Sequence, residues 1–214
     1  MATSGRLIIN YSPRQNPQKP SFVYITKGGF FMRLDHIAYR VQDRFKTAEF
    51  FINCFGYRLE PELPDGFKID FEDGSSAKCL VLLPPERMSD DAPWKHLQMT
   101  GSSQQVYHLP PELFVSDGSP DSVVGKWVAA RNGVGGIHHL AYQVDSVQKT
   151  MKEWQEKGYA EFTTEDPLTC PGLTQVFTKP SALTGVIYEF IEREAQGFCQ
   201  DNVKDLMEST KDLG

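Results

Sequence analysis

The feature that most constrains the fold of this chain is an internal repeat. The run HIAYRV, which begins at His36, returns as HLAYQV at His139, and each run is followed by Lys-Thr and then by Gly-Tyr. The Lys-Thr pairs lie at the same distance in sequence from their histidines, and only the Gly-Tyr pairs differ, by one residue. A match that extends over a strand-like run, a helix-like run and a glycine indicates a duplicated structural unit. It places one histidine at the same position in each half.

Both copies predict the order β-α-β-β-β. In the first copy, β-branched and aromatic residues predict a strand over 34–41, and apolar residues at helical spacing predict a helix over 44–55, capped by Asp43 and ended by Gly56. Three further strands are expected, at 57–60, 67–71 and 78–83. The second copy predicts a strand over 137–144, a helix over 147–157 ended by Gly158, and strands at 161–163, 174–179 and 185–191.

The repeat also divides the chain. Residues 1–32, which contain three prolines, are expected to form an irregular N-terminal arm with a short strand near Val23. The rest, 33–214, is expected to be one domain with four parts: module one (33–83), an insertion (84–136), module two (137–193) and a C-terminal segment (194–214). The insertion is expected to contain a strand at 105–109 and a helix at 121–131, and the last segment an amphipathic helix at 202–212.

Composition excludes several classes of protein. A net charge of -6 without a basic stripe argues against nucleic-acid binding. No apolar run is long enough to span a bilayer, and the four cysteines are too scattered for a disulfide framework, so a cytoplasmic protein with reduced thiols is expected. The glycines at 133–136 precede a predicted strand instead of opening a helix, which argues against a dinucleotide-binding loop.

Strand alternation suggests a metal site. Glu189 shares a strand face with Ile187 and Ile191, and a buried carboxylate without a partner costs several kcal/mol, so it should be paired or bound to a metal. Aligning the last strands of the two modules places Val81 opposite Glu189. The first and last strands of the two modules then supply four related positions. Three of these carry metal donors, His36, His139 and Glu189, and the fourth carries Val81. Two histidines and one carboxylate with other positions open suit Fe(II) and oxygen chemistry.

Simpler interpretations of these residues stay open. A lone histidine in a strand is more often a hydrogen-bonded core residue, and Glu189 could pair with a lysine. By alternation, His138 is expected to point to the opposite face from His139 and to serve in packing. Glu86 and Glu112 are candidate fourth ligands, although solvated loop carboxylates are the simpler interpretation.

The paired H-x-A-x-x-V runs resemble the vicinal oxygen chelate superfamily, which includes glyoxalase I, methylmalonyl-CoA epimerase and extradiol dioxygenases. The second half resembles the 4-hydroxyphenylpyruvate dioxygenase family in its C-terminal domain, through QVFTKP around Gln175, YEFIER from Tyr188, and QGF from Gln196 with Asn202. The resemblance implies an α+β fold in which paired βαβββ modules form one curved mixed sheet around a metal site.

The same resemblance implies roles for particular residues. Fe(II), or another divalent metal, would be held by His36, His139 and Glu189. Gln175 and Phe177 would face the substrate, and the C-terminal helix would act as a lid. Val203 stands where the family has an aromatic ring that sandwiches the substrate, which leaves the substrate open.

The leading hypothesis is therefore a non-haem Fe(II)-dependent oxygenase that acts with O₂ on a small 2-oxo acid or another metal-chelating substrate. Gln175 would orient the substrate and Phe177 would pack on it. The alternatives are a metal-dependent isomerase, epimerase or lyase of the glyoxalase type, and a metal-free protein of the same fold that binds a small molecule. Because both modules lie in one chain, the site could be complete in a monomer, and a monomer or a homodimer is expected. No nucleic-acid or membrane partner is expected.

Overall fold

The computed structural model describes residues 7–9, 22–24, 32–85, 110–194 and 198–213. The chain divides into two compact units, residues 1–32 and residues 33–214. In the first unit, β1 (Leu7–Ile9) pairs antiparallel with β2 (Phe22–Tyr24). Strand β2 coincides with the short strand that was expected near Val23, and β1 is an addition to the irregular arm that the prolines predicted.

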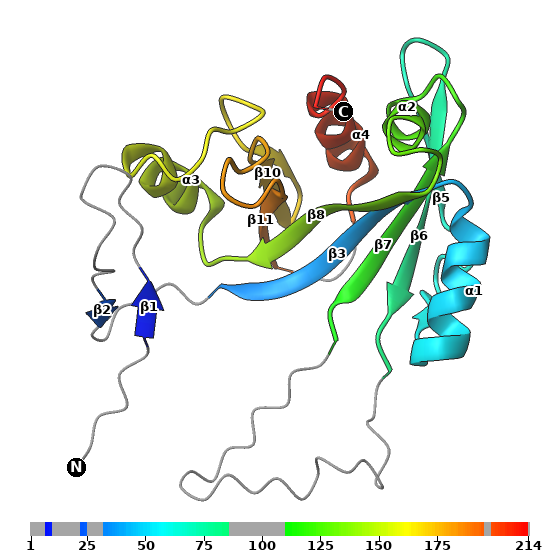
Figure 1. Cartoon of the computed structure of the whole chain (residues 1–214), viewed down its shortest axis with the longest axis horizontal. Coiled ribbons are helices and arrows are strands. Elements are labelled where there is room, and N and C mark those ends of the chain that lie inside the picture. Colours follow the sequence, from blue (N-terminus) through cyan, green and yellow to red (C-terminus); the bar gives the residue numbers. More distant parts are fainter. Residues whose placement is uncertain (1–6, 10–21, 25–31, 86–109, 195–197, 214) are drawn as a thin grey trace, which may run out of the picture. The chain divides into compact units, whose positions relative to one another are not determined.

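The second unit is built on one mixed sheet (Figure 1). Its nine strands are β3 (Arg33–Val41), β4 (Arg58–Leu59), β5 (Phe67–Asp70), β6 (Ser76–Leu83), β7 (Glu112–Gly118), β8 (Gly135–Gln143), β9 (Leu168–Cys170), β10 (Leu173–Phe177) and β11 (Ile187–Arg193). The order across the sheet is β4-β6-β7-β3-β8-β11-β10-β9, and β5 pairs with β6. This open, curved sheet with its helices confirms the predicted α+β fold class.

The sheet has the same strand order on both sides of its centre. There β3 pairs antiparallel with β8; β7 lies parallel to β3, and β11 lies parallel to β8. Outward from these, β6 pairs antiparallel with β7, and β10 pairs antiparallel with β11. The two modules therefore correspond strand by strand, with β7 equivalent to β11 and β6 equivalent to β10.

This correspondence corrects one expectation from the sequence. Strand β7 lies in the segment between the two repeats, so the counterpart of Glu189 is on β7 and not on β6. Glu189 pairs with Ala141 of β8, and Phe114 pairs with the corresponding Ala38 of β3. Phe114, and not Val81, therefore occupies the fourth related position. The strand expected at 105–109 lies outside the described residues.

Local sequence signals account for the helix ends. Helix α1 (Arg44–Phe55) begins where the Asp43 side chain accepts hydrogen bonds from two backbone N–H groups, and it ends at Gly56, whose φ of 74° is left-handed. Helix α3 (Val147–Glu156) begins after a Ser146 cap and is followed by Gly158 with a φ of 65°. Both stops were predicted. The other two helices are α2 (Val123–Ala129) and α4 (Gln200–Ser209).

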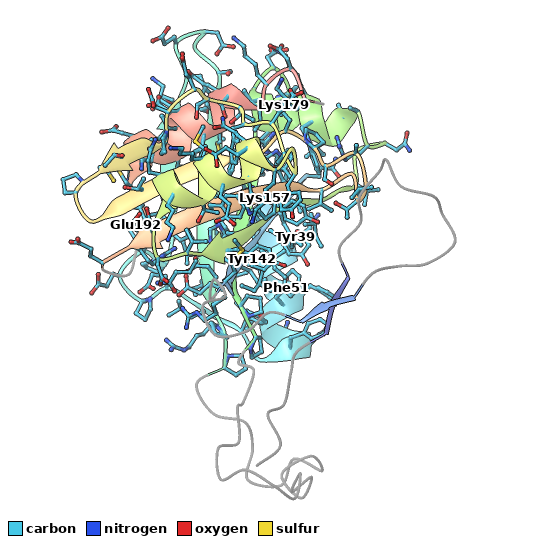
Figure 2. The ribbon with its side chains drawn as sticks, turned by 90° about the vertical axis from the view of Figure 1, so that its left-hand side faces the viewer. Tyr39, Phe51, Tyr142, Lys157, Lys179 and Glu192 are labelled. Atoms are coloured by element: carbon cyan, nitrogen blue, oxygen red, sulfur yellow. The ribbon has the colours of Figure 1, made fainter. Side chains whose placement is uncertain are left out.

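Strand β6 shows how both faces of the sheet are buried. Its residues Leu80 and Leu82 pack in a cluster under α1. That cluster includes Tyr39, whose ring centroid is 5.3 Å from that of Phe51 on α1 (Figure 2). Alternate residues of β6, among them Cys79, point to the other face, as the two-residue period of a strand requires.

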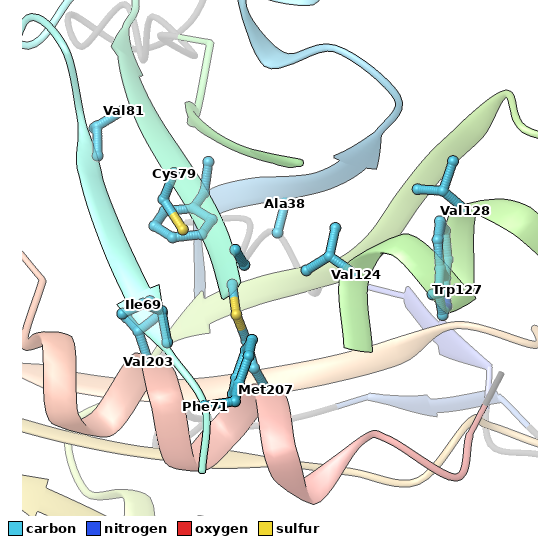
Figure 3. Close-up of a cluster of buried hydrophobic side chains, with 12 residues drawn as sticks. Ala38, Ile69, Phe71, Cys79, Val81, Val124, Trp127, Val128, Val203 and Met207 are labelled. Carbon is cyan, nitrogen blue, oxygen red and sulfur yellow. The ribbon is translucent and has the colours of Figure 1, made fainter. Parts of the chain in front are cut away.

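The second face carries a cluster that includes α2 and α4 (Figure 3). Val203 and Met207 of α4 pack there with Ile69, and Trp127 is contributed by α2. Both helices lie on the same side of the sheet (Figure 1). The face that carries His36 is consequently covered by α4, which follows the last strand of the chain.

Candidate metal centre

Three adjacent strands each supply one donor to a buried cluster. His36 lies on β3, His139 on β8 and Glu189 on β11, and the three residues are 2%, 7% and 1% exposed. Glu189 Oε2 lies 3.2 Å from His36 Nε2 and 3.0 Å from His139 Nε2, and the two nitrogens are 3.4 Å apart. The structure therefore brings together the three residues that the sequence singled out, and they form a donor group that could hold a metal ion.

These separations fit a metal ion. First-row metals bind histidine nitrogen and carboxylate oxygen at about 2.1 Å. With bonds of about that length, ligands at a right angle lie about 3.0 Å apart, and tetrahedral ligands about 3.4 Å apart. The observed distances fall in this interval. A ligand set of two imidazole nitrogens and one carboxylate oxygen suits Fe(II), Zn(II), Co(II) or Mn(II).

An irregularity in the strand pairing precedes each histidine. Leu34 pairs with Tyr142 and His36 with Ala141, so Asp35 has no partner across the ladder. Ala38 pairs with His139 and Tyr39 with Ile137, so His138 is skipped in the same way. Such an extra residue forms a β-bulge, which breaks the strict alternation of side chains.

The bulge corrects the expectation for His138. Its ring lies beside that of His139, with 2.8 Å between the two Nδ1 atoms, instead of pointing away on the opposite face. The alternation that predicted the opposite face does not hold at the extra residue. The other bulge residue, Asp35, also contacts the histidine that follows it: Asp35 Oδ1 accepts a hydrogen bond from His36 Nδ1 at 2.9 Å. Asp35 is in turn held by Arg193 Nη2 at 2.7 Å.

These contacts orient both imidazoles. Occupation of Nδ1 leaves Nε2 of each ring directed at the common centre, as is usual for metal-binding histidines. If His139 Nε2 gives its lone pair to a metal, its Nδ1 must carry the hydrogen and donate it to His138 Nδ1. The hydrogen of His138 is then on Nε2, a buried atom without a hydrogen-bond partner among the described residues.

A relay of amides fixes the carboxylate. Gln175 Nε2 donates to Glu189 Oε1 at 2.6 Å, and Asn202 Nδ2 on α4 donates to Gln175 Oε1 at 3.2 Å. An ionised carboxylate only accepts hydrogen bonds, which determines the orientation of the Gln175 amide. Gln175 was expected to face the substrate; here both ends of its amide contact protein groups. The ring of Phe177, the other expected substrate contact, lies 4.5 Å from the ring of His139.

The charges of the three donors depend on one another. Burial opposes the charged form of His36, but Glu189 and Asp35 outweigh it and raise the pKa of His36 to about 9. Burial lowers the pKa of His139, and its contact with Glu189 only partly opposes this. Burial would raise the pKa of Glu189, yet the two histidines hold it well below its usual range. At neutral pH the metal-free cluster therefore has a negatively charged Glu189 and a positively charged His36.

The cluster lines a small pocket under α4. The cavity is about 30 Å³, which is room for two or three water molecules at roughly 10–15 Å³ each. Phe198 and Phe114 border it beside His36, with ring centroids 5.2 and 6.4 Å from that ring. Val203 of α4 also lines it, so the C-terminal helix lies where a lid was expected. A ligand larger than a few waters therefore needs a wider pocket than this one.

Of the two candidate fourth ligands, Glu112 does not belong to this cluster. Glu112 pairs with His36 across the ladder, and burial raises the pKa of its carboxyl. Among the described residues, however, the group of converging donors consists of His36, His139 and Glu189. Glu86 lies outside the described residues. The related fourth position carries the apolar Phe114.

Comparison with known proteins agrees with this architecture. Residues 35–169 match the family described as the glyoxalase/bleomycin resistance protein/dioxygenase superfamily. The chain belongs to this superfamily. Its members, the vicinal oxygen chelate proteins, are mostly metalloenzymes. No curated protein matches the chain. Among the described residues, no helix is long and apolar enough to cross a membrane, and a cytoplasmic location stays a prediction.

Solved structures show the same fold at low sequence identity. A triple mutant of 4-hydroxymandelate synthase from Streptomyces coelicolor has a TM-score of 0.63 and 17% identity, and the match covers 94% of this chain and 61% of that one. A methylmalonyl-CoA epimerase has a TM-score of 0.54 and 20% identity, covering 79% of this chain and 100% of that one. A hypothetical protein from Bacillus halodurans has a TM-score of 0.50 and 22% identity, covering 78% and 99%.

Proposed function

We propose that this protein is a non-haem Fe(II)-dependent oxygenase of the vicinal oxygen chelate superfamily, which acts on a small 2-oxo acid or another metal-chelating substrate. The observation that carries the proposal is the three-donor set of His36, His139 and Glu189 with Phe114 at the fourth related position. Three protein ligands leave positions open for substrate oxygens and for O₂. The motif around Gln175 supports it, since it resembles that of 4-hydroxyphenylpyruvate dioxygenases.

The chain's own residues prepare the site for this chemistry. Fe(II), when bound, would supply chelation of the substrate and reaction with O₂. Asp35 and His138 keep the Nε2 atoms directed inward, and Gln175 holds one oxygen of Glu189 so that the other faces the centre. Phe177 and Phe198 cover the centre on two sides and keep bulk water away from it.

The described pocket is less suited to the isomerase alternative. An enolising reaction needs a general base at the substrate carbon. Among the described residues that line the pocket, Glu189 is the only carboxylate, and it contacts both histidines. The oxygenase reaction places no such demand on a second carboxylate.

Oxygen uptake is the direct test. The protein is loaded with Fe(II) without oxygen, its bound metal is measured, and O₂ consumption is followed with a panel of 2-oxo acids. We expect substrate-dependent uptake, lost in Glu189→Gln and retained in Glu156→Gln, which changes an exposed carboxylate on α3. A loaded protein that consumes no O₂ with any acid would contradict the proposal. Turnover without O₂ and with Co(II) or Mn(II) would indicate the isomerase, and a protein that binds no metal would indicate the binding protein.

A further inference from the structure

One buried cation in the pocket has no counter-ion among the described residues. Arg40 lies on the same face of β3 as His36, is 3% exposed, and lines the same pocket as the three donors. Its Nη2 donates to Thr210 Oγ1 at 2.9 Å, at the end of α4. Its Nη1 is buried and has no hydrogen-bond partner among the described residues.

Two other arginines with buried side chains in the described part of the chain are paired. Arg44 Nη1 lies 3.0 Å from Asp117, and Arg193 Nη2 lies 2.7 Å from Asp35. No carboxylate of the described residues forms such a pair with Arg40. Burial, opposed by Cys79 and assisted by the charge of Arg131, lowers the pKa of Arg40 to about 9. An unpaired buried charge is costly, so its retention calls for a partner that arrives from outside.

A second unpartnered polar atom borders the same pocket. His138 Nε2 is buried without a hydrogen-bond partner among the described residues. His138 and Arg40 line the same pocket. Besides the donor cluster, the pocket is therefore lined by two residues that each have a polar atom without a hydrogen-bond partner among the described residues: Arg40 (Nη1) and His138 (Nε2).

We infer that Arg40 binds a second carboxylate of the substrate, so that the substrate is a short 2-oxo acid with a carboxylate at its far end. This inference rests on the proposed function, since it assumes that the 2-oxo acid end meets the metal. Four residues of strand separate the Cα atoms of His36 and Arg40, about 13 Å at 3.3 Å each. His36 and Arg40 line the same pocket, so a ligand with a carboxylate at each end could contact both once the pocket widens. The planar guanidinium can bind a carboxylate through two parallel hydrogen bonds.

A matched pair of ligands tests the inference. 2-Oxoglutarate and 2-oxopentanoate have the same carbon chain and differ only in a carboxylate or a methyl group at carbon five. Their binding to the full chain loaded with Co(II) is measured by calorimetry. We expect 2-oxoglutarate to bind at least tenfold more tightly to the unmodified protein, and the ratio to fall to about one in Arg40→Met. Arg131→Met removes an exposed cation beside Trp127 and should keep the ratio.

The competing role for Arg40 is structural, as an anchor for α4 through Thr210. In that case Arg40→Met would weaken both ligands by the same factor and would lower the Tm. On our inference the substitution removes an unpaired buried charge, and the Tm stays the same or rises. Arg40→Lys should restore part of the ratio, because it keeps the charge without the two-pronged geometry. Equal affinities for the two acids in the unmodified protein, or an unchanged ratio in Arg40→Met, would overturn the inference.

A metal-free arm separates this inference from the proposed function. Glutarate and pentanoate are compared by thermal shift on the metal-free protein. A larger shift with glutarate that disappears in Arg40→Met supports the carboxylate site even if the protein takes up no metal or no O₂. The same shift with both ligands, in a protein that does bind metal and consume O₂, overturns the site and leaves the proposed function standing.

Discussion

The Gln175 amide donates a 2.6 Å hydrogen bond to Glu189 Oε1, while the other oxygen of that carboxylate faces the two histidines. The two side chains come from neighbouring antiparallel strands, β10 and β11. The contact is fully buried, so the carboxylate cannot turn away from the centre without losing its donor. Gln175, which was expected to face the substrate, thus positions the carboxylate of the candidate metal ligand Glu189.

Gln175→Leu should therefore weaken metal binding. Loss of the donor frees the Glu189 carboxylate to rotate, and changes of this kind reduce metal affinity by roughly 10–100-fold. Calorimetric titration of the metal-free protein with Co(II) measures the effect. Gln155→Leu changes an exposed glutamine on α3 and should leave the affinity unchanged. Equal affinities for the two variants would show that Gln175 does not position the ligand.

Phe114→Glu should convert the three-donor site into a four-donor site. Phe114 is the counterpart of Glu189 in the strand pairing, and its ring centroid is 6.4 Å from that of His36. We expect tighter binding of Zn(II) or Co(II) and loss of any O₂ consumption, because the new carboxylate fills an open position. Leu113→Glu puts the same charge on the opposite face of β7, in the cluster under α1, and should only destabilise the fold. Retained O₂ consumption in Phe114→Glu would argue against the strand correspondence.

Metal affinity should rise with pH up to about 9. A metal must displace the proton from His36, whose pKa is raised to about 9 by Glu189 and Asp35 against the effect of burial. Below that pH the apparent affinity should fall by roughly tenfold per unit. In the metal-free protein, the same raised pKa contributes stability that is complete below the ordinary value of 6.5 and is lost as the pH rises through about 9. Titrations with Co(II) at several pH values measure the first effect, and a flat profile between pH 7 and 9 would contradict it.

Asp35→Asn should shift that profile. Loss of the carboxylate next to His36 Nδ1 lowers the pKa of His36, so the pH at which metal affinity levels off should fall. Affinity at high pH should also decrease, because the imidazole is less firmly oriented. Asp70→Asn, at an exposed carboxylate, serves as the control. The prediction is wrong if both variants have the profile of the unmodified protein.

Leu80→Ala should destabilise the fold independently of any metal. Leu80 is fully buried in the cluster beneath α1, and large-to-small changes at such sites cost about 2–5 kcal/mol. Chemical denaturation of the metal-free protein gives the change in the free energy of unfolding. Leu183→Ala, at a side chain that is 80% exposed, should stay within about 0.5 kcal/mol. A similar loss of unfolding free energy in both variants would contradict the place of Leu80 in the hydrophobic core.

Much of the molecule followed from local patterns in the sequence. The repeat around His36 and His139 determined the two modules, because a duplicated unit folds in the same way twice. Asp43, Gly56 and Gly158 determined helix ends through caps and left-handed backbone, which are local effects. The two-residue period of the last strand was enough to place Glu189 on a buried face.

Other features were decided only by the tertiary structure, because they depend on which strands pair and in what register. The place of β7 in the sheet moved the fourth related position from Val81 to Phe114. The bulge at His138 turned its ring toward His139, which no alternation rule could predict from one strand alone. That Arg40 has no counter-ion among the described residues became visible only in the packed structure. Residue types and spacing determine which donors a chain carries, but strand register determines which of them meet.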